Sequence, residues 1–290
     1  MARLIESLAE ITADYDALYC DIWGCVHDGI RSFPEAVDAL KRFREAGGRV
    51  ILLTNAPRPR AEIAVQISGL GVPRDAWDTI ATSGDSARMA LFQGAVGRRV
   101  YHIGVASDLG FFEPPRVLED PTPVERVPLA EAEGIVCTGP FDALADLDTL
   151  RPDLLRAKIE GLPLLCANPD IVVDRGTRRE WCAGAVARLY TEMGGRSLYF
   201  GKPHPPIYDL ARRRLSDLGA DIPSSRILAI GDGIATDVAG ALGEDIDVLF
   251  VTGGLAAQET RTAHQPDPDA LARFLQAEGW TPTFAIGHLR

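Results

Sequence analysis

Lysine is scarce in this sequence: only Lys41, Lys158 and Lys202 stand among 30 basic residues. Positive charge as a whole is in deficit, with a net charge of −11, so no basic stripe is available to neutralise the phosphates of a nucleic acid. The deficit does not argue against a small phosphorylated ligand, because a local site can be positive on an acidic protein. Each lysine therefore becomes a candidate for a specific role.

Cysteine pairs and long apolar runs are also missing. The five cysteines are odd in number and scattered, with no Cys-x-x-Cys pair, which favours a reducing compartment over a disulfide framework or a zinc site. No apolar stretch approaches about 18 residues. Residues 1–16 carry charges throughout, unlike a signal peptide. We therefore expect a cytoplasmic protein with no membrane partner and no nucleic-acid partner.

What the sequence does contain is an alternation of strand and helix patterns. Residues 17–20 and 49–53 read as buried strands, each followed by a helical pattern after a short connection, which predicts a parallel sheet covered by helices. A second alternating set occupies residues 96–196, after which the first pattern resumes. We expect an α/β protein with a Rossmann-like core, residues 1–95 and 197–290, and an inserted α/β cap domain, residues 96–196.

Polar residues recur where the strands of the predicted core end, and they are Asp21, Thr54 with Asn55, Lys202, and Asp232 with Asp237. The carboxyl ends of parallel strands meet at one edge of a sheet, where ligands bind. Several carboxylates at that edge repel one another unless a cation lies among them, and Mg²⁺ with a substrate phosphate satisfies that need. Lysine would then face the phosphate while Asp21 attacks phosphorus.

This ordered set resembles the haloacid dehalogenase superfamily, in particular the class IIA, NagD-like sugar and nucleotide phosphatases. The four motifs that carry the resemblance are Asp21-Ile22-Trp23-Gly24, Thr54-Asn55, Gly201-Lys202-Pro203, and Gly231-Asp232 through Thr236-Asp237. Ala167-Asn168-Pro169-Asp170 looks like the Asn-Pro-Asp signature of that class's C2-type cap, between the second and third motifs. The resemblance covers nearly the whole chain.

The resemblance implies a role for each matched residue. Asp21 is implied as the nucleophile and a Mg²⁺ ligand, with the backbone carbonyl of Trp23 and the Asp232 carboxylate as further ligands. Asp237 is implied to support the metal site from outside the direct ligands. The phosphate-binding residues implied are Thr54, Asn55 and Lys202, and Lys202 also balances charge in catalysis. Relatives of this class often pair through their caps, so the resemblance also implies a homodimer.

One position departs from the family pattern. The second aspartate of the first motif, which protonates the leaving group and then activates water, is replaced by Trp23, and an indole serves as neither acid nor base at neutral pH. Three interpretations stay open: hydrolysis of esters with good leaving groups, recruitment of another group such as nearby His27, or binding of a phosphorylated ligand with little turnover. His27 itself is more typical of a turn residue, and dehalogenation would not need a complete metal site.

Overall fold

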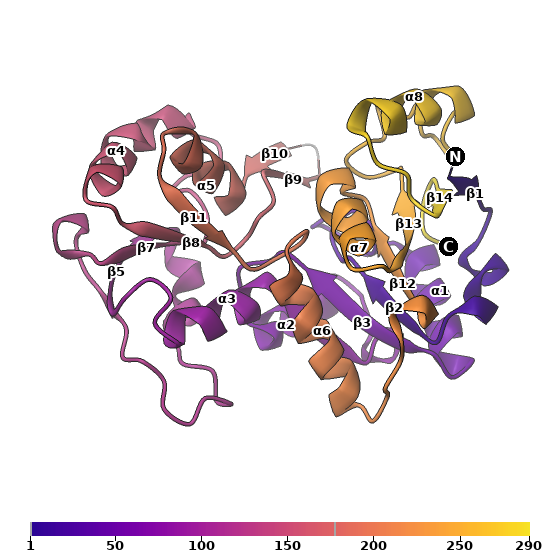
Figure 1. The fold of residues 1–290 in the computed structure, drawn as a ribbon. Helices are drawn as coiled ribbons and strands as arrows, with labels where there is room; N and C mark the ends of the chain where they lie inside the picture. Colours follow the sequence, from indigo (N-terminus) through magenta and orange to yellow (C-terminus); the bar gives the residue numbers. More distant parts are fainter. Residues whose placement is uncertain (1, 177) are drawn as a thin grey trace.

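The computed structural model describes residues 2–176 and 178–290, and its strands and helices form two lobes (Figure 1). Each lobe is built on its own parallel β-sheet, as expected for an α/β protein. Both chain termini lie in the lobe of the larger sheet, where the first and last strands are neighbours. In the described part of the chain, every helix is too short or too polar to cross a membrane.

The larger sheet has seven strands, and all of its pairings are parallel. In spatial order the strands are β1 (Arg3–Leu4), β14 (Phe284–Ile286), β13 (Asp247–Val251), β12 (Ile227–Gly231), β2 (Ala17–Cys20), β3 (Arg49–Thr54) and β4 (Thr79–Thr82). From β2 the chain adds β3 and β4 on one side, whereas β12, β13 and β14 extend the sheet on the other. The order therefore reverses between β2 and β12, and ligands of open α/β sheets bind at such a point.

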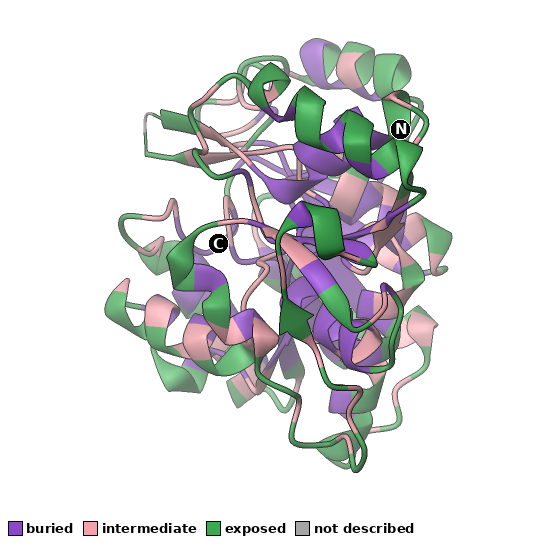
Figure 2. Ribbon diagram, turned by 90° about the vertical axis from the view of Figure 1, so that its left-hand side faces the viewer, coloured by how far each residue is buried: buried purple, intermediate pink, exposed green. Residues whose placement is uncertain are grey.

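Both faces of this sheet are buried, which explains why its strands are continuous apolar runs. Leu18 and Cys20 pack on one face, whereas Ala17 and Tyr19 pack on the other, as the two-residue period of a strand requires. Helices α1 (Pro34–Glu45) and α2 (Arg60–Gly69) cover the first face. Helices α6 (Pro205–Asp217), α7 (Ala239–Gly243) and α8 (Pro268–Glu278) cover the second. Figure 2 shows the resulting pattern, with buried strands inside and exposed outer helix faces.

The smaller sheet has five parallel strands and forms the other lobe. Its strands, in spatial order, are β11 (Arg196–Tyr199), β8 (Pro163–Cys166), β7 (Gly134–Cys137), β5 (Arg99–Ile103) and β6 (Glu125–Arg126). Helices α4 (Arg151–Ile159) and α5 (Ala183–Glu192) pack on one face, and α3 (Ser83–Phe92) packs on the other through Ala87, Leu91 and Phe92.

Several local predictions were wrong. We expected 197–200 to resume the core pattern, but β11 pairs with β8 in the smaller sheet. The helical pattern of residues 180–193 predicts a helix, which the structure has as α5, but its expected first residues belong to β10 (Arg178–Trp181), which pairs antiparallel with β9 (Val172–Arg175). The division into core and cap at residues 95 and 197 stays a prediction. Strand β11 and helix α3 indicate that the smaller lobe takes some residues from each side of that division.

Candidate active site

Asp21 lies one residue beyond β2, at the point where the strand order of the larger sheet reverses. Its backbone N–H donates to the carbonyl of Ile230 in the neighbouring strand β12 (2.8 Å), which continues the ladder to the edge. Its carboxylate Oδ1 lies 2.7 Å from Lys202 Nζ, and both side chains are buried. The sheet thus presents a carboxylate and an ammonium in contact at its ligand-binding edge.

Lys202 reaches this edge from the segment that connects β11 to α6, rather than from a strand of the larger sheet as we expected. Its ammonium contacts Asp21 Oδ1 and Asp237 Oδ1, each at 2.7 Å, and donates to the carbonyl of Leu53 at 3.1 Å. The lysine has three donors, and these three acceptors match them. Its position is therefore fixed with the charge pointing at Asp21.

Asp232 and Asp237 follow β12, on the other side of the reversal point. Asp237 lies in one turn of π-helix (Ile234–Val238), and its Oδ2 accepts from the backbone N–H of Gly233 at 3.1 Å. Asp232 is buried, and its Oδ2 accepts from the backbone N–H of Leu255 at 2.9 Å. Asp237 therefore supports Lys202, whereas Asp232 faces the site with one oxygen held by the loop after β13.

The cluster carries more negative than positive charge, because the carboxylates of Asp21, Asp232 and Asp237 share one ammonium. Burial and the neighbouring carboxylates raise the pKa of Asp21 despite its contact with Lys202. Burial and Asp237 also raise the pKa of Asp232 to about 7. For Lys202, burial lowers the pKa but Asp21 and Asp237 outweigh it, so the pKa lies well above its ordinary value. The cluster is electrostatically suited to a cation.

The residues present fit a divalent metal ion. Ligand atoms of Asp21, Cys25 and Asp232 all lie within 4.8 Å of one another. Gly24 and Gly254 leave room around Asp232, because a Cβ at either position would lie 2.2 Å or 2.0 Å from its Oδ2. Burial and the two carboxylates raise the pKa of Cys25, so its thiol stays protonated and the donor set is one of hard oxygens. Sequence reasoning missed Cys25, because its direction in the loop is not readable from the motif.

Thr54 and Asn55 also reach the edge, but their contacts differ from those expected of phosphate ligands. The Asn55 amide oxygen accepts from the Lys202 backbone N–H (2.7 Å), and its Nδ2 donates to Asp170 Oδ1 (2.8 Å) and to the Lys202 carbonyl (3.1 Å). Thr54 Oγ1 accepts from the N–H of Ala56 at 3.2 Å and keeps its own hydrogen for another partner. Asn55 thus holds the lysine segment and the cap signature together, and Thr54 is the better placed to donate to a ligand.

The side chain of Trp23 points toward the smaller lobe and is not placed to transfer a proton. Its indole Nε1 donates to the carbonyl of Asp174 in β9 at 2.7 Å. The neighbouring His27 is buried, and its Nδ1 accepts from the backbone N–H of Gly29 at 3.0 Å. Burial lowers the pKa of His27 to about 4, so it is neutral at physiological pH. Its contacts are those of a turn residue, in agreement with the sequence pattern.

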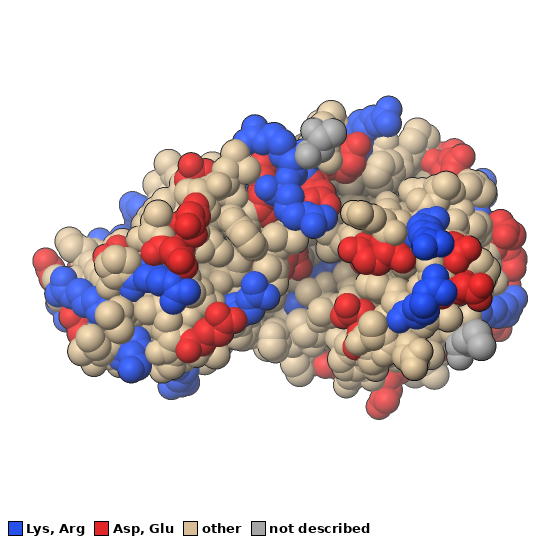
Figure 3. Space-filling model, turned by 90° about the horizontal axis from the view of Figure 1, so that it is seen from above, with Lys and Arg blue, Asp and Glu red and all other residues tan. Residues whose placement is uncertain are grey.

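A cavity of about 400 Å³ lies beside Asp232, between the two lobes. Asp170 and Val172 line it from the smaller lobe, and Ile234, Leu255 and Phe274 line it from the larger one. The space-filling view shows the surface hollowed where the lobes meet, with acidic and basic side chains around it (Figure 3). The site therefore opens into a space large enough for a small molecule.

The fold and the site together define a protein of the α/β class with a buried carboxylate–lysine cluster at the reversal point of its larger sheet. Two family models match the chain, one for haloacid dehalogenase-like hydrolases over residues 18–113 and a related one over residues 199–277, together more than half of its length. A haloacid dehalogenase-like hydrolase from Brucella suis 1330 is 42% identical, covers 99% of this chain and 100% of its own, and superposes with a TM-score of 0.85. The chain belongs to the haloacid dehalogenase-like hydrolases, and its structural neighbours are NagD-like phosphatases.

More distant relatives are known as phosphatases. The D-glycerol 3-phosphate phosphatase of Mycobacterium tuberculosis is 26% identical over 254 residues, which are 86% of this chain and 66% of that protein. This chain thus spans just under two thirds of that relative's length. A crystal structure of the mycobacterial glycerol phosphate phosphatase in complex with magnesium is 24% identical, with a TM-score of 0.64, and covers 98% of this chain and 77% of its own.

Proposed function

We propose that this protein is a Mg²⁺-dependent phosphatase of small phosphorylated metabolites, with Asp21 as its nucleophile. The observation that carries the proposal is the contact of Asp21 with Lys202 beside Asp232, at the reversal point of the sheet. The mycobacterial relatives support the reaction class, and the oxygen donors support the metal. The metal ligands we propose are one oxygen each of Asp21 and Asp232 and the backbone carbonyl of Trp23. When bound, Mg²⁺ offsets the negative charge of the transferring phosphoryl group.

In the first proposed step, a carboxylate oxygen of Asp21 attacks phosphorus, and the bond from phosphorus to the ester oxygen breaks. Lys202 keeps its proton throughout and lies beside the attacking carboxylate, so it compensates charge on the phosphoryl oxygens. Thr54 donates its hydroxyl hydrogen to one of those oxygens. The leaving oxygen departs as an anion or takes a proton from water, because Trp23 has none to give at neutral pH.

In the second proposed step, water attacks the phosphoryl group on Asp21, which releases inorganic phosphate and restores the carboxylate. The residue that would take the proton from this water in the family pattern is Trp23 here. General acid–base assistance of this kind is worth about 10²–10⁴-fold. The second step is therefore expected to be slow. Because the leaving group of the first step has no acid to protonate it either, the preferred substrates are esters with good leaving groups, such as aryl phosphates.

A second function class is a phosphate-ligand binding protein with little turnover. The observation that favours it is the bond from the Trp23 indole to Asp174, which commits the usual acid position to a structural contact. Tight Mg²⁺-dependent binding of a phosphorylated ligand without release of phosphate would support this alternative. The homodimer through the smaller lobe stays a prediction from the resemblance.

The proposal is tested by phosphate release from an aryl phosphate, with Mg²⁺ and with a chelator. We expect release with Mg²⁺, loss of release with the chelator, and loss again in Asp21→Asn. The matched control is Asp209→Asn, an aspartate on helix α6 whose side chain is 63% exposed. Release that is unchanged in Asp21→Asn would contradict the proposed nucleophile, and binding without release would favour the second function.

A further inference from the structure

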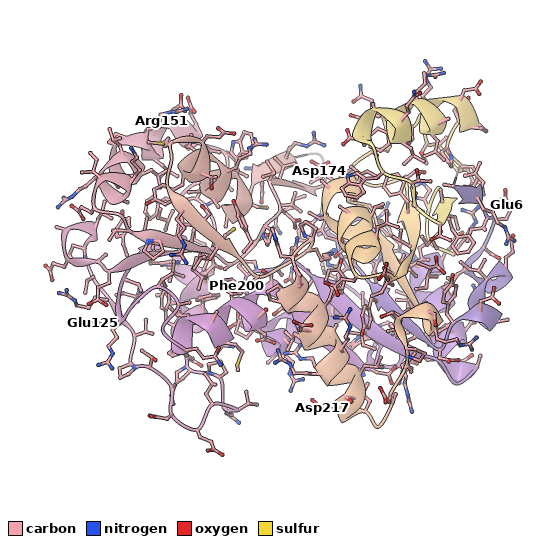
Figure 4. The ribbon with its side chains drawn as sticks, viewed as in Figure 1. Glu6, Glu125, Arg151, Asp174, Phe200 and Asp217 are labelled. Atoms are coloured by element: carbon pink, nitrogen blue, oxygen red, sulfur yellow. The ribbon has the colours of Figure 1, made fainter. Side chains whose placement is uncertain are left out.

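We propose that Trp23 is a positioning residue that fastens the smaller lobe to the loop that follows Asp21. We call β9 and β10 together the cap hairpin, and residues 24–32 the flap loop. The docking is independent of turnover, and its consequence for substrate binding rests on the proposed function. Asp174, labelled in Figure 4, is where the hairpin meets the larger lobe, since its carbonyl accepts from the Trp23 indole.

The hairpin side of this contact is held by two neighbouring residues of β9. The Asp174 carbonyl accepts from the indole N–H at 2.7 Å, and the guanidinium carbon of Arg175 lies 5.2 Å from the centre of the indole ring. The Asp174 carboxylate pairs with Arg179 of β10 through two bonds of 2.7 and 2.8 Å. The residue that accepts from Trp23 is therefore also fixed within the hairpin.

The flap side is shaped to receive the indole. Gly29 has φ +82°, and a Cβ there would lie 2.5 Å from Trp23 Cζ2, so the ring lies directly against the glycine. His27 packs its ring edge-on at 5.0 Å. The carbonyl of Asp28 accepts from the backbone N–H of Gly176 at 3.3 Å, which adds a second bond between loop and hairpin. The indole thus packs against the flap loop and donates a hydrogen bond to the hairpin.

An aspartate at residue 23 would supply neither the side-chain N–H nor the ring. In this chain, residue 23 therefore docks the hairpin on the flap loop instead of transferring a proton. The chain just before the hairpin contributes Asp170 and Ile171 to the 400 Å³ cavity, and Val172 of β9 lines it as well. Fastening β9 to the flap loop fixes this wall of the cavity. Loosening it is expected to weaken substrate binding more than it slows chemistry.

The test is hydrogen exchange of the full chain, compared between wild type, Trp23→Phe and Arg175→Ala. Trp23→Phe keeps an aromatic ring but removes the N–H donor and part of the ring that lies against Gly29. Loss of one net hydrogen bond raises the equilibrium constant for opening of the hairpin about two- to tenfold. We therefore expect the amides of β9 and β10 to exchange faster by that factor in both variants. The matched control is Arg178→Ala, an exposed arginine of the same hairpin, which should leave exchange unchanged.

Exchange in the buried strand β12 shows whether a change is local. Unchanged hairpin exchange in Trp23→Phe, with β12 unchanged, would overturn the proposal. If Trp23→Phe accelerates β12 as well, the fold has loosened, and Arg175→Ala is compared with Glu180→Ala, which removes the Arg175–Glu180 pair (3.2 Å) but leaves the guanidinium on the indole. Exchange confined to the hairpin that is faster in Arg175→Ala than in Glu180→Ala supports the docking, and equal exchange in the two variants overturns it. On an aryl phosphate we expect a raised KM and an unchanged kcat in Arg175→Ala, because Arg175 contacts the indole but lies outside the proposed metal and phosphate site. If Trp23→Phe accelerates hairpin exchange but the wild-type protein releases no phosphate, the docking is upheld and the phosphatase function is refuted.

Discussion

Lys202 is the cation on which the carboxylates of this site depend, since Asp21 and Asp237 both contact its ammonium at 2.7 Å. A buried ion pair contributes little net stability compared with apolar residues of the same volume. Loss of one partner is costly, however, because the other charge stays buried and uncompensated. At this site two carboxylates would lose their partner at once.

We therefore predict that Lys202→Met lowers the free energy of unfolding by about 3–5 kcal/mol without metal. The measurement is chemical denaturation in a chelator, with Lys158→Met as control, because Lys158 lies exposed on α4. An equal effect of the two substitutions would contradict the buried charge cluster described above.

At the residue scale, the motifs predicted that polar side chains meet at one edge of the sheet, and the structure places Asp21, Lys202, Asp232 and Asp237 together there. For Asp21 and Asp232 the apolar strand pattern before each residue was enough, whereas Lys202 reaches the edge from the segment after β11, a strand of the smaller sheet. The use of the Asn55 amide and the indole of Trp23 was not predictable. Both depend on which way a side chain points across the gap to the smaller lobe, and motif spacing carries no such information.

Among the elements, the loop after β13 decides how Asp232 is held, through the Leu255 backbone N–H and the space at Gly254. A methyl group at residue 254 would lie 2.0 Å from Asp232 Oδ2 and displace it. We predict that Gly254→Ala weakens Mg²⁺ binding at least about tenfold, seen as a lost rise of Tm on addition of Mg²⁺.

The control for this substitution is Gly243→Ala at the end of α7, where a Cβ would meet nothing within 4 Å. It should keep the Mg²⁺-dependent rise of Tm and stabilise the protein by about 0.4–1 kcal/mol. A normal Tm response in Gly254→Ala would show that Asp232 does not hold the metal.

Strand β5 of the smaller sheet carries His102, whose ring Nε2 lies 2.9 Å from Thr138 Oγ1. Burial, with a smaller contribution from Arg126, lowers its pKa to about 4. The unfolded chain binds the proton near pH 6.5, so His102 costs no stability above that pH and destabilises the fold as pH falls from 6.5 toward 4. We predict that His102→Gln flattens the decline of Tm over this window. A wild-type decline that persists unchanged in the variant would assign it to other groups.

The strands and helices differ in how far the sequence could predict them. Apolar runs such as 17–20 and 49–53 predicted central strands, since strands buried on both faces leave that pattern. The cap hairpin was missed because it is short, charged and stabilised by pairing with itself and by Trp23, so no apolar period marks it. Likewise, β11 was assigned to the wrong sheet, because sheet membership depends on tertiary pairing with β8.

For the whole molecule, the arrangement of the two lobes and the proposed chemistry depend on each other. The larger lobe supplies Asp21, the proposed nucleophile, and the smaller lobe closes one wall of the cavity. We propose that the smaller lobe is fastened by Trp23, at the position where the family pattern of the first motif has an aspartate. The fold class followed from the alternation of elements. The relative placement of the lobes did not, because it rests on contacts such as Asn55 with Asp170, which join residues far apart in the sequence.

We propose that Asp21 forms a covalent phosphoryl intermediate whose hydrolysis lacks a base. The most direct measurement is rapid-mixing release of an aryl alcohol from an aryl phosphate in the presence of Mg²⁺. The account predicts a burst close to one equivalent per active site, followed by slower steady release, because formation of the intermediate needs no acid whereas its hydrolysis needs a base. The burst should be absent in Asp21→Asn. Steady release without a burst, or a burst that survives in Asp21→Asn, would contradict the account.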